Sequence, residues 1–294
     1  LVLNYTKAYT TYGIKVAVAP DIPNNHGSIE VFTFYAPEGC ILNAPRPYPV
    51  AARHIIGHLL PDTILGCVHQ MLEGGVQAEG SSALWNIQLR SGPSVSVSTD
   101  FEGAIPSFDM MHFNSGGTGA RPTLDGLSAT GFPSGVRGVP VEATESIVPI
   151  IFWRKELRAD SGGAGRRRGG LGQAIELGGV GGAPFDVLAM FERVDNAAIG
   201  RNGGLPGATG EVRLASGARL RPKGQQPVPP RDRLVLGLPG GGGFGPPRER
   251  PVEQVLGDIA DGYVSAVAAA ELYGVVLDPD GNLNEAATAE ARGR

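Results

Sequence analysis

Two glycine-rich stretches constrain the fold of this chain more than any other feature of its sequence. Residues 160–172 read D-S-G-G-A-G-R-R-R-G-G-L-G, and residues 238–245 read L-P-G-G-G-G-F-G. Glycine has no Cβ, so it adopts positive φ angles without strain and lets another segment of backbone or a ligand come very close. We therefore expect each stretch to be either a ligand-binding loop or a place where backbone packs closely.

The sequence that follows each stretch argues against a nucleotide-binding loop. A phosphate loop opens directly into a helix that begins with Lys and Ser or Thr. Residues 161–172 contain no lysine, and residues 173–177 have the pattern of a strand. The second stretch contains the G-x-G-x-x-G spacing of dinucleotide-binding folds, but Pro246 and Pro247 follow at once and prevent the helix that this motif requires.

Three consecutive arginines, Arg166 to Arg168, lie in the first stretch. An RNA-binding segment would interleave such a basic run with aromatic side chains, and none is interleaved here. We expect a structural hairpin whose arginines pair with carboxylates of the same chain or of a partner subunit.

Composition indicates a turn-rich globular protein. The chain has 294 residues, 41% of them hydrophobic, which is enough for one large domain or two ordinary ones. Its 45 glycines and 24 prolines stay just under the share of about 25–30% that is typical of low-complexity chains. The net charge of −4 provides no basic field that would attract nucleic acid or an anionic membrane, so we expect neither as a partner.

Cysteine content and hydropathy predict a cytoplasmic location. Cys40 and Cys67 are the two cysteines, and they lie in no CxxC or mixed Cys/His spacing that would indicate a disulfide framework or a zinc site. The sequence has no apolar run of 18 or more residues and no signal-peptide pattern. These features predict a reducing compartment and no membrane contact.

The first part of the chain combines expected strands with one expected helix. Apolar and β-branched residues alternate loosely with polar ones over residues 1–19 and again over residues 28–35, which predicts strands. Apolar residues recur at helical spacing over residues 50–72, which predicts a helix with a kink at Pro61-Asp62, or two helices with a break there. Residues 1–138 are therefore expected to form a mixed α/β segment with a central helix.

Residues 139–294 have the pattern of a β-rich module that ends in helices. Short strands separated by Gly, Pro and Asn are expected over residues 174–236. A helix is expected over residues 252–261, and a second helix has Ser265 as its N-cap and Gly274 as its C-cap.

Together these patterns predict an α+β fold. Its C-terminal module is predominantly β, with short strands and glycine-rich turns, and its helices lie near residues 50–72 and 252–274. The alternating residues 94–98 predict a further strand. We place a domain boundary near Gly138, where a segment of glycine loops gives way to a longer run of strands.

Few residues stand out as candidates for catalysis. No G-x-S-x-G nucleophile motif is present. His112 precedes a glycine loop and is the best single candidate, and Asp125 and Glu142 are weak candidates, because an Asp beside a turn more often caps backbone amides. His54 and His58 have the i, i+4 spacing that can hold a metal from one helical face, but no Glu follows as in HExxH, so we interpret them as an ordinary packed or solvated pair and predict no metal site.

A series of motifs runs in order along nearly the whole chain. It comprises residues 20–27 (PDIPNNHG), 36–43 (APEGCILN), 116–122 (GGTGARP) with Asp125 and Gly126, 140–142 (PVE), 156–172, 238–246 and 273–277 (YGVVL). In this order and spacing the motifs resemble the hydantoinase B/5-oxoprolinase family, and specifically the C-terminal half of a B-type subunit. Members of that family carry a further N-terminal region before the point where this chain begins.

The resemblance implies a catalytic partnership. In that family a B-type subunit works with an A-type subunit that binds ATP through an actin-like fold, and the pair opens cyclic amides such as 5-oxoproline or hydantoins after phosphorylating the amide oxygen. ATP and Mg²⁺ are therefore expected on the A-type partner. A divalent metal is expected on Asp and His residues of the N-terminal region, so we assign no metal ligand and no cofactor to this chain. The remaining expected partners are that N-terminal half of the B-type subunit and a small-molecule substrate.

The same motifs nominate binding or interface residues, namely Asn25, Arg121, Asp160, Gly162, Gly163, Gly241 and Gly242. Two alternatives to the cyclic-amide hydrolase stay open. Related assemblies carboxylate ketones such as acetone or acetophenone, also with ATP, and the motifs of this chain do not separate the two chemistries. A third interpretation is a non-catalytic scaffold whose glycine loops pack against a partner.

Overall fold

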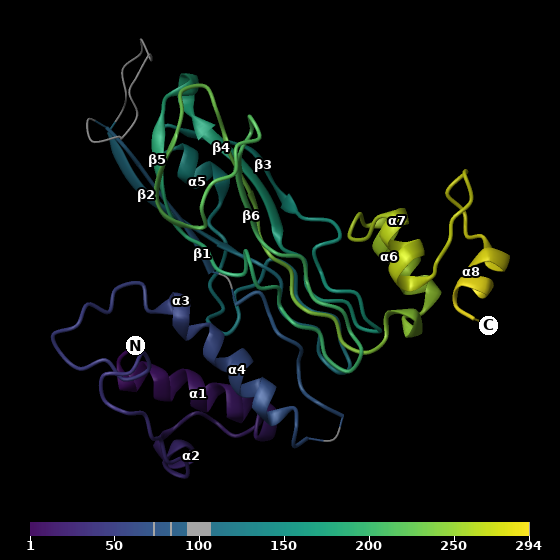
Figure 1. Cartoon of the computed structure of the whole chain (residues 1–294), viewed down its shortest axis with the longest axis horizontal. Helices are drawn as coiled ribbons and strands as arrows, with labels where there is room; N and C mark the ends of the chain where they lie inside the picture. The colour runs from purple at the N-terminus through teal and green to yellow at the C-terminus, as the bar shows by residue number, and fades with distance from the viewer. Residues whose placement is uncertain (73, 83, 93–106, 294) are drawn as a thin grey trace.

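The computed structural model describes residues 1–72, 74–82, 84–92 and 107–293. It is a mixed fold of helices and two antiparallel sheets (Figure 1). The helices are α1 (Leu3–Val18), α2 (His26–Glu30), α3 (His54–Gly57), α4 (Leu59–Val68), α5 (Val141–Glu145), α6 (Val252–Ala260), α7 (Ala266–Ala268) and α8 (Glu285–Ala291), with the short turns η1 (Val180–Gly182), η2 (Pro247–Glu249) and η3 (Ala269–Tyr273). The strands are β1 (Leu84–Ser91), β2 (Phe108–Ser115), β3 (Ile150–Leu157), β4 (Gln173–Gly179), β5 (Phe185–Met190), β6 (Glu211–Leu214), β7 (Lys223–Val228) and β8 (Leu234–Gly237). The strand expected at residues 94–98 lies outside the described residues.

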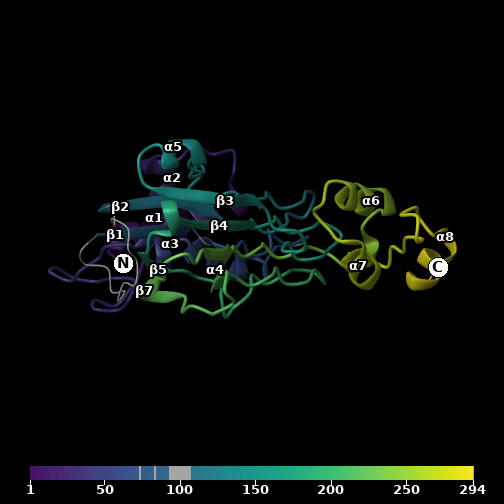
Figure 2. The same cartoon turned by 90° about the horizontal axis from the view of Figure 1, so that it is seen from above.

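The two sheets pack face to face as a sandwich (Figures 1 and 2). One sheet has the strand order β2-β1-β5-β7 and the other has the order β3-β4-β8-β6. Side chains alternate along a strand, so every second residue points between the sheets. These inward residues form one apolar core, in which the following side chains are at most 1% exposed: Trp85, Ile87, Leu89, Ile175, Leu177, Leu234 and Leu236. The strand expected directly after the first glycine stretch is confirmed as β4.

The first sheet contains strands from both sides of residue 138. Strands β1 and β2 precede this residue, whereas β5 and β7 follow it. The register of β1 with β5 runs from Gln88 opposite Leu188 to Arg90 opposite Asp186. The division of the chain into residues 1–138 and 139–294 stays a prediction.

The strands expected over residues 1–19 are wrong, because this segment forms the helix α1. Its tyrosines and threonines favour strands, but local preference is weak compared with tertiary packing. Helix α1 packs on α4, and an added Cβ at Gly13 would lie 3.1 Å from both Ile64 Cβ and Pro61 Cα. The contact of these two helices therefore decides the structure of this segment (Figure 1).

The strand expected over residues 28–35 is also wrong. Asn25 Oδ1 accepts a hydrogen bond from Ser28 N at 2.9 Å, and Ser28 Oγ accepts one from Asn25 N at 3.2 Å. This reciprocal pair is a capping box, which satisfies the free amides at the start of α2. The segment from residue 31 to residue 53 then has no regular secondary structure.

The helix expected over residues 50–72 is confirmed as α3 and α4. The break falls at His58 and not at Pro61, since Pro61 lies in the first turn of α4, where a missing amide is tolerated. Helix α3 reaches the outer face of β1, where His54 Nε2 lies 3.0 Å from Asn86 Nδ2.

The glycine-rich stretches form a bundle of extended segments between the sandwich and the C-terminal helices (Figures 1 and 2). We call this part the glycine bundle, and its segments are residues 77–82, 116–121, 126–130, 161–172, 198–208 and 238–245. An added Cβ at Gly117 would lie 1.8 Å from Gly170 O, and one at Gly241 would lie 1.9 Å from Thr118 O. Within residues 238–245 only Gly245 has a positive φ. Close backbone approach, more than unusual φ, therefore requires glycine here.

Residues 240–243 show how the bundle is built. Their amides donate to carbonyl oxygens of three surrounding parts of the chain, Gly240 to Ala208, Gly241 to Gly170, Gly242 to Glu79 and Gly243 to Leu205. Gly240 and Gly243 thus donate to the same neighbouring segment, residues 198–208. The direction of the donated hydrogen bond repeats every three residues, as in an extended polyproline II helix. Because the central segment meets backbone on every side, its positions leave no room for side chains.

The helices expected near residues 252–274 are confirmed as α6, α7 and η3, which lie beyond the far end of the bundle (Figure 1). Ser265 Oγ accepts a hydrogen bond from Ala268 N at 3.1 Å and caps α7, as expected. Gly274 has a φ of 65° and ends η3, also as expected. Val255, Tyr273 and Val275 are buried in a second apolar cluster that holds these helices together.

Candidate functional site

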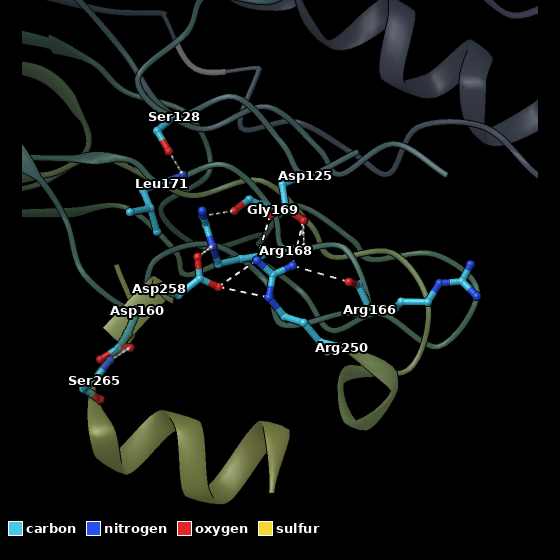
Figure 3. Close-up of polar contacts among 10 residues, drawn as sticks. All are labelled: Asp125, Ser128, Asp160, Arg166, Arg168, Gly169, Leu171, Arg250, Asp258 and Ser265. Atoms are coloured by element: carbon cyan, nitrogen blue, oxygen red, sulfur yellow. Dashed lines mark hydrogen bonds and ion pairs between the residues drawn. The ribbon is translucent and has the colours of Figure 1, made fainter. Parts of the chain in front are cut away.

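A largely buried network of two arginines and two aspartates joins the glycine bundle to α6 (Figure 3). Arg250 donates from Nη1 and Nη2 to the two carboxylate oxygens of Asp125 at 2.8 Å each, and from Nε to Asp258 Oδ2 at 3.0 Å. Arg168 Nε donates to Asp258 Oδ1 at 3.3 Å, and the amide of Arg168 donates to Asp125 Oδ1 at 2.8 Å. The side chains of Arg168, Arg250 and Asp258 are at most 8% exposed.

The charges of this network compensate each other. Burial alone would raise the pKa of Asp125, but the hydrogen bonds and charge of Arg250 outweigh it and hold this pKa below its ordinary value. Burial alone would lower the pKa of Arg250, and Asp125 outweighs that effect and raises it. Because both oxygens of Asp125 are engaged and its ionised form is favoured, the geometry favours a structural link over the general base that the sequence suggested.

The expected hairpin of residues 160–172 agrees with the structure. Its chain turns at Gly165 and Arg166, and Gly169 N donates back to Gly163 O at 2.9 Å. Arg166 pairs with Glu249 at 3.5 Å, while Arg168 belongs to the network above. The arginines thus find carboxylates within the same chain, except for Arg167, which is considered below.

The other candidates from the first glycine motifs also lie at the bundle. Asp160 Oδ1 accepts a hydrogen bond from Ser265 N at 2.8 Å and so fixes the start of α7 (Figure 3). Arg121 Nη2 donates to Asp125 O at 2.6 Å across a turn. An added Cβ would lie 2.1 to 2.3 Å from a backbone oxygen at Gly162, Gly163 and Gly242. Asn25 is separate from this group and caps α2.

A second polar cluster lies where β2 and β3, edge strands of the two sheets, meet α5. His112 is fully buried, with Nδ1 3.0 Å from Thr144 Oγ1 and Nε2 3.2 Å from Lys155 Nζ. An ammonium group can only donate, so Nε2 accepts from Lys155 and the proton of the neutral ring is on Nδ1. Burial, with the charge of Lys155 as a smaller cause, lowers the pKa of His112 to about 4.

The structure brings Glu142 to the same cluster. Glu142 is exposed on α5. Burial lowers the pKa of Lys155, while the charge of Glu142 opposes this shift. Lys155 also donates to Val139 O at 2.7 Å. Sequence reasoning missed Lys155, although it is one of four lysines in a chain whose basic residues are mostly arginine.

A buried acid on α4 was also missed. Asp62 is 2% exposed; its Oδ2 accepts from Gly80 N at 3.0 Å and from the hydroxyl of Ser82. Burial raises the pKa of Asp62 to about 7 despite these hydrogen bonds and the nearby charge of Arg193. In the sequence, Asp62 follows Pro61 within an apolar run and was interpreted as part of a helix break.

The described residues do not fit a divalent metal. Over residues 1–72, 74–82, 84–92 and 107–293, no three or more His, Cys, Asp or Glu side chains come close enough together to hold one. His54 and His58 lie on either side of the break between α3 and α4, with ring centroids 6.1 Å apart. In the same part of the chain, no helix has the length and apolar character needed to span a membrane.

Comparison with known proteins decides the family. Residues 1–247 match the family model described as Hydantoinase B/oxoprolinase. The chain belongs to the hydantoinase B/oxoprolinase family. It is 35% identical over 195 residues to the beta chain of the caprolactamase of Pseudomonas jessenii, an alignment that covers 58% of this chain and 31% of that protein. It is 28% identical over 283 residues to the B component of a putative D-/L-hydantoinase of Pseudomonas sp., covering 92% of this chain and 45% of that protein.

Solved structures agree with this membership. The crystal structure of ATP-dependent caprolactamase from Pseudomonas jessenii superposes with a TM-score of 0.77 at 27% identity, over 97% of this chain and 50% of that chain. A nucleotide-free structure of acetone carboxylase superposes with a TM-score of 0.65 at 22% identity, over 97% of this chain and 43% of that chain, which shows a shared fold. This hydantoinase B/oxoprolinase family chain thus spans at most about half the length of the relatives it matches.

Proposed function

We propose that this chain is a subunit, or part of one, of an ATP-dependent hydrolase of cyclic amides that works with an ATP-binding A-type subunit. The observation that carries this proposal is the superposition of 97% of the chain on ATP-dependent caprolactamase. The hydantoinase relative supports the same substrate class, because a hydantoin is also a cyclic amide. We place the assembly in the cytoplasm, as the sequence predicts.

We place ATP and Mg²⁺ on the A-type partner and the divalent metal on the N-terminal half of the B-type subunit. The glycine bundle supports this division. Its segments pack backbone against backbone, and the space between them is too small for a nucleotide. In this proposal the bundle and the network of Figure 3 give the subunit a rigid body on which those partners assemble.

Within this chain, the cluster around Lys155 is our candidate for a direct contribution to catalysis. His112 is fully buried, with both ring nitrogens engaged, so it can act on a substrate only through Lys155. Lys155 is half-buried and Glu142 is exposed, so these two groups can reach a ligand. In this arrangement His112 is a positioning residue that directs the ammonium group of Lys155.

The test is a reconstitution of the complete B-type polypeptide with an A-type subunit. Adding caprolactam, 5-oxoproline or a hydantoin is expected to start phosphate release from ATP, and the matched control omits the cyclic amide. No turnover with any cyclic amide, together with bicarbonate-dependent consumption of a ketone, would instead assign the ketone carboxylase activity suggested by the shared fold.

The scaffold alternative is separated by variants of the same assembly. A catalytic role for the cluster predicts that Glu142→Ala or Lys155→Met lowers kcat without dissociating the subunits. Unchanged activity in both variants and in Asp125→Ala, together with dissociation of a Gly162→Ala variant that still folds, would show that this chain is a scaffold.

A further inference from the structure

Arginines surround the far end of the glycine bundle. Arg167 forms an antiparallel bridge with Phe244, and Arg201 forms a parallel bridge with the same residue from the other side. Ala120 N donates to Gly242 O at 2.9 Å, which brings the next residue, Arg121, to this end as well. Three segments that are distant in sequence thus place basic side chains around residues 242–245.

Arg121, Arg167 and Arg201 have no carboxylate ion pair among the residues that the structure describes, and of these three only Arg121 and Arg167 line the pocket described below. The side chain of Arg121 donates to the backbone oxygen of Asp125, and the side chain of Arg167 has no hydrogen-bond or ion-pair partner within the described chain. The Nε atoms of both residues are buried without an acceptor. A guanidinium that is partly removed from water without a counter-charge costs free energy, so both groups favour an anion at their remaining nitrogens.

The two side chains line one open pocket between the bundle and α6. Three other charged residues of its wall, Asp125, Arg250 and Asp258, are engaged with each other and with Arg168 in the network of Figure 3. Gln254 and the exposed Asp261 complete the polar wall. Within the network, the charges of Arg168 and Arg250 are balanced by those of Asp125 and Asp258. The remaining charged groups of the pocket wall are the guanidinium groups of Arg121 and Arg167 and the solvated carboxylate of Asp261.

We propose that this pocket binds a phosphate group between Arg121 and Arg167. The planar fork of a guanidinium matches two oxygens of a phosphate, and a phosphate has enough oxygens and negative charge to bind both arginines at once. The phosphate can come from free inorganic phosphate or from the terminal group of a nucleotide. The site stands on the geometry of this chain and does not depend on the proposed function.

The test measures binding of inorganic phosphate to the full chain by calorimetry, with sodium chloride at the same ionic strength as the reference. Phosphate is expected to bind the unmodified protein and to raise its Tm. Arg121→Gln and Arg167→Gln are each expected to lower the affinity about tenfold or more, since each removes charged hydrogen bonds to the anion. Arg248→Gln is the matched control, because Arg248 is exposed and does not line the pocket.

We expect the variants at Arg167 to fold, because backbone hydrogen bonds hold this residue in place. Arg167 is held by backbone hydrogen bonds to Phe244 in both directions at 2.9 Å, which Arg167→Gln keeps. Arg167→Lys keeps the charge and loses the fork, so its affinity should lie between those of the parent and Arg167→Gln. Displacement of bound phosphate by ADP would identify a nucleotide as a source, and absence of displacement would identify free phosphate. Phosphate that is no more effective than chloride, or that binds both glutamine variants unchanged, would overturn the proposal.

Discussion

The glycine bundle and the β-sandwich reach close packing by opposite means. In the sandwich, large side chains such as Trp85, Ile87 and Leu177 fill the space between two sheets. In the bundle, backbone meets backbone, and an added Cβ at Gly117 or Gly241 would lie within 2 Å of a carbonyl oxygen. The sandwich is therefore sensitive to the removal of atoms, which leaves a cavity, whereas the bundle is sensitive to the addition of a single methyl group.

The largest effect is expected for Gly241→Ala. The new Cβ would meet Thr118 O at 1.9 Å, and this oxygen belongs to backbone that is itself held in the bundle. We expect a loss of about 5 kcal/mol or more in the free energy of unfolding, or no folded protein. Leu177→Ala in the sandwich is the comparison, with an expected loss of about 2–5 kcal/mol. Urea unfolding followed by circular dichroism measures both, and a smaller loss for Gly241→Ala than for Leu177→Ala would refute the contrast.

The next largest effect is expected where the bundle meets α6. Arg250→Ala leaves Asp125 and Asp258 without their shared cation, and breaking a buried pair in this way costs about 3–5 kcal/mol. Arg166→Ala is the control, because the ion pair of Arg166 with Glu249 is exposed and contributes less than about 1 kcal/mol. Similar losses in the free energy of unfolding for Arg250→Ala and Arg166→Ala would show that the buried network stabilises the protein no more than an exposed ion pair does.

The network also predicts a pH dependence. The folded pKa of Asp125 lies below its unfolded value of 3.8, so its ionised form adds stability that is present above that value and lost as the pH falls through the folded pKa. The difference in free energy of unfolding between the parent and Arg250→Ala should therefore shrink below pH 3.8. If the difference in free energy of unfolding stays constant down to the pH at which the protein unfolds in acid, the ion pair of Asp125 with Arg250 does not stabilise the fold.

A smaller effect is expected from His112 in the sandwich. Its pKa is 6.5 in the unfolded chain and about 4 in the folded protein, so the unfolded chain takes up the proton first as the pH falls. The stability that the neutral ring contributes is fully present above pH 6.5 and is lost as the pH falls to 4, by roughly 3 kcal/mol. Asp62 changes the stability in the opposite direction as the pH falls. Its folded pKa is raised to about 7, so the folded protein takes up this proton before the unfolded chain does.

Comparison with His112→Gln isolates the histidine from Asp62. Unfolding at a series of pH values should show the advantage of the parent over this variant narrowing from pH 6.5 to pH 4. An advantage that stays constant over this range would mean that His112 is protonated in the folded state.

The smallest effect is expected for Gly257→Ala, and its sign is reversed. Gly257 lies in α6, has no atom within 4 Å of an added Cβ and has no positive φ. Alanine in a helix interior is favoured over glycine by about 0.5–1 kcal/mol, so the variant should be more stable. Thermal unfolding measures the gain, and a destabilised variant would show that glycines outside the bundle are also required by packing.

The sequence predicted the elements whose local signals and tertiary setting agree. Ser265 and Gly274 cap their helix as expected, and the strand after Gly172 forms β4. Residues 1–19 were misassigned, because Tyr and Thr favour strands locally while the contact of α1 with α4 at Gly13 selects a helix. The packing of the bundle was not predictable in detail, since its six segments come from distant parts of the chain and glycine carries no side-chain pattern that indicates which segments meet.

The candidate site was predicted in part for the same reason. The motifs led to Asp125, Asp160 and the bundle glycines, which do lie together. His112 contacts Lys155, and the charge of Glu142 acts on the same lysine. Lys155 and Asp62 were missed, because their settings arise from burial against segments that are remote in sequence. Neither carries a motif of its own.

Native-state hydrogen exchange of the amides at Gly241, Gly242 and Gly243 tests the central claim, that the glycine stretches form a backbone-packed core. These amides donate to Gly170 O, Glu79 O and Leu205 O, so they should exchange as slowly as Leu177 in β4 and only through global unfolding. Exchange as fast as that of the exposed Gly138 would contradict the account, because it would show that the glycine stretches are loops.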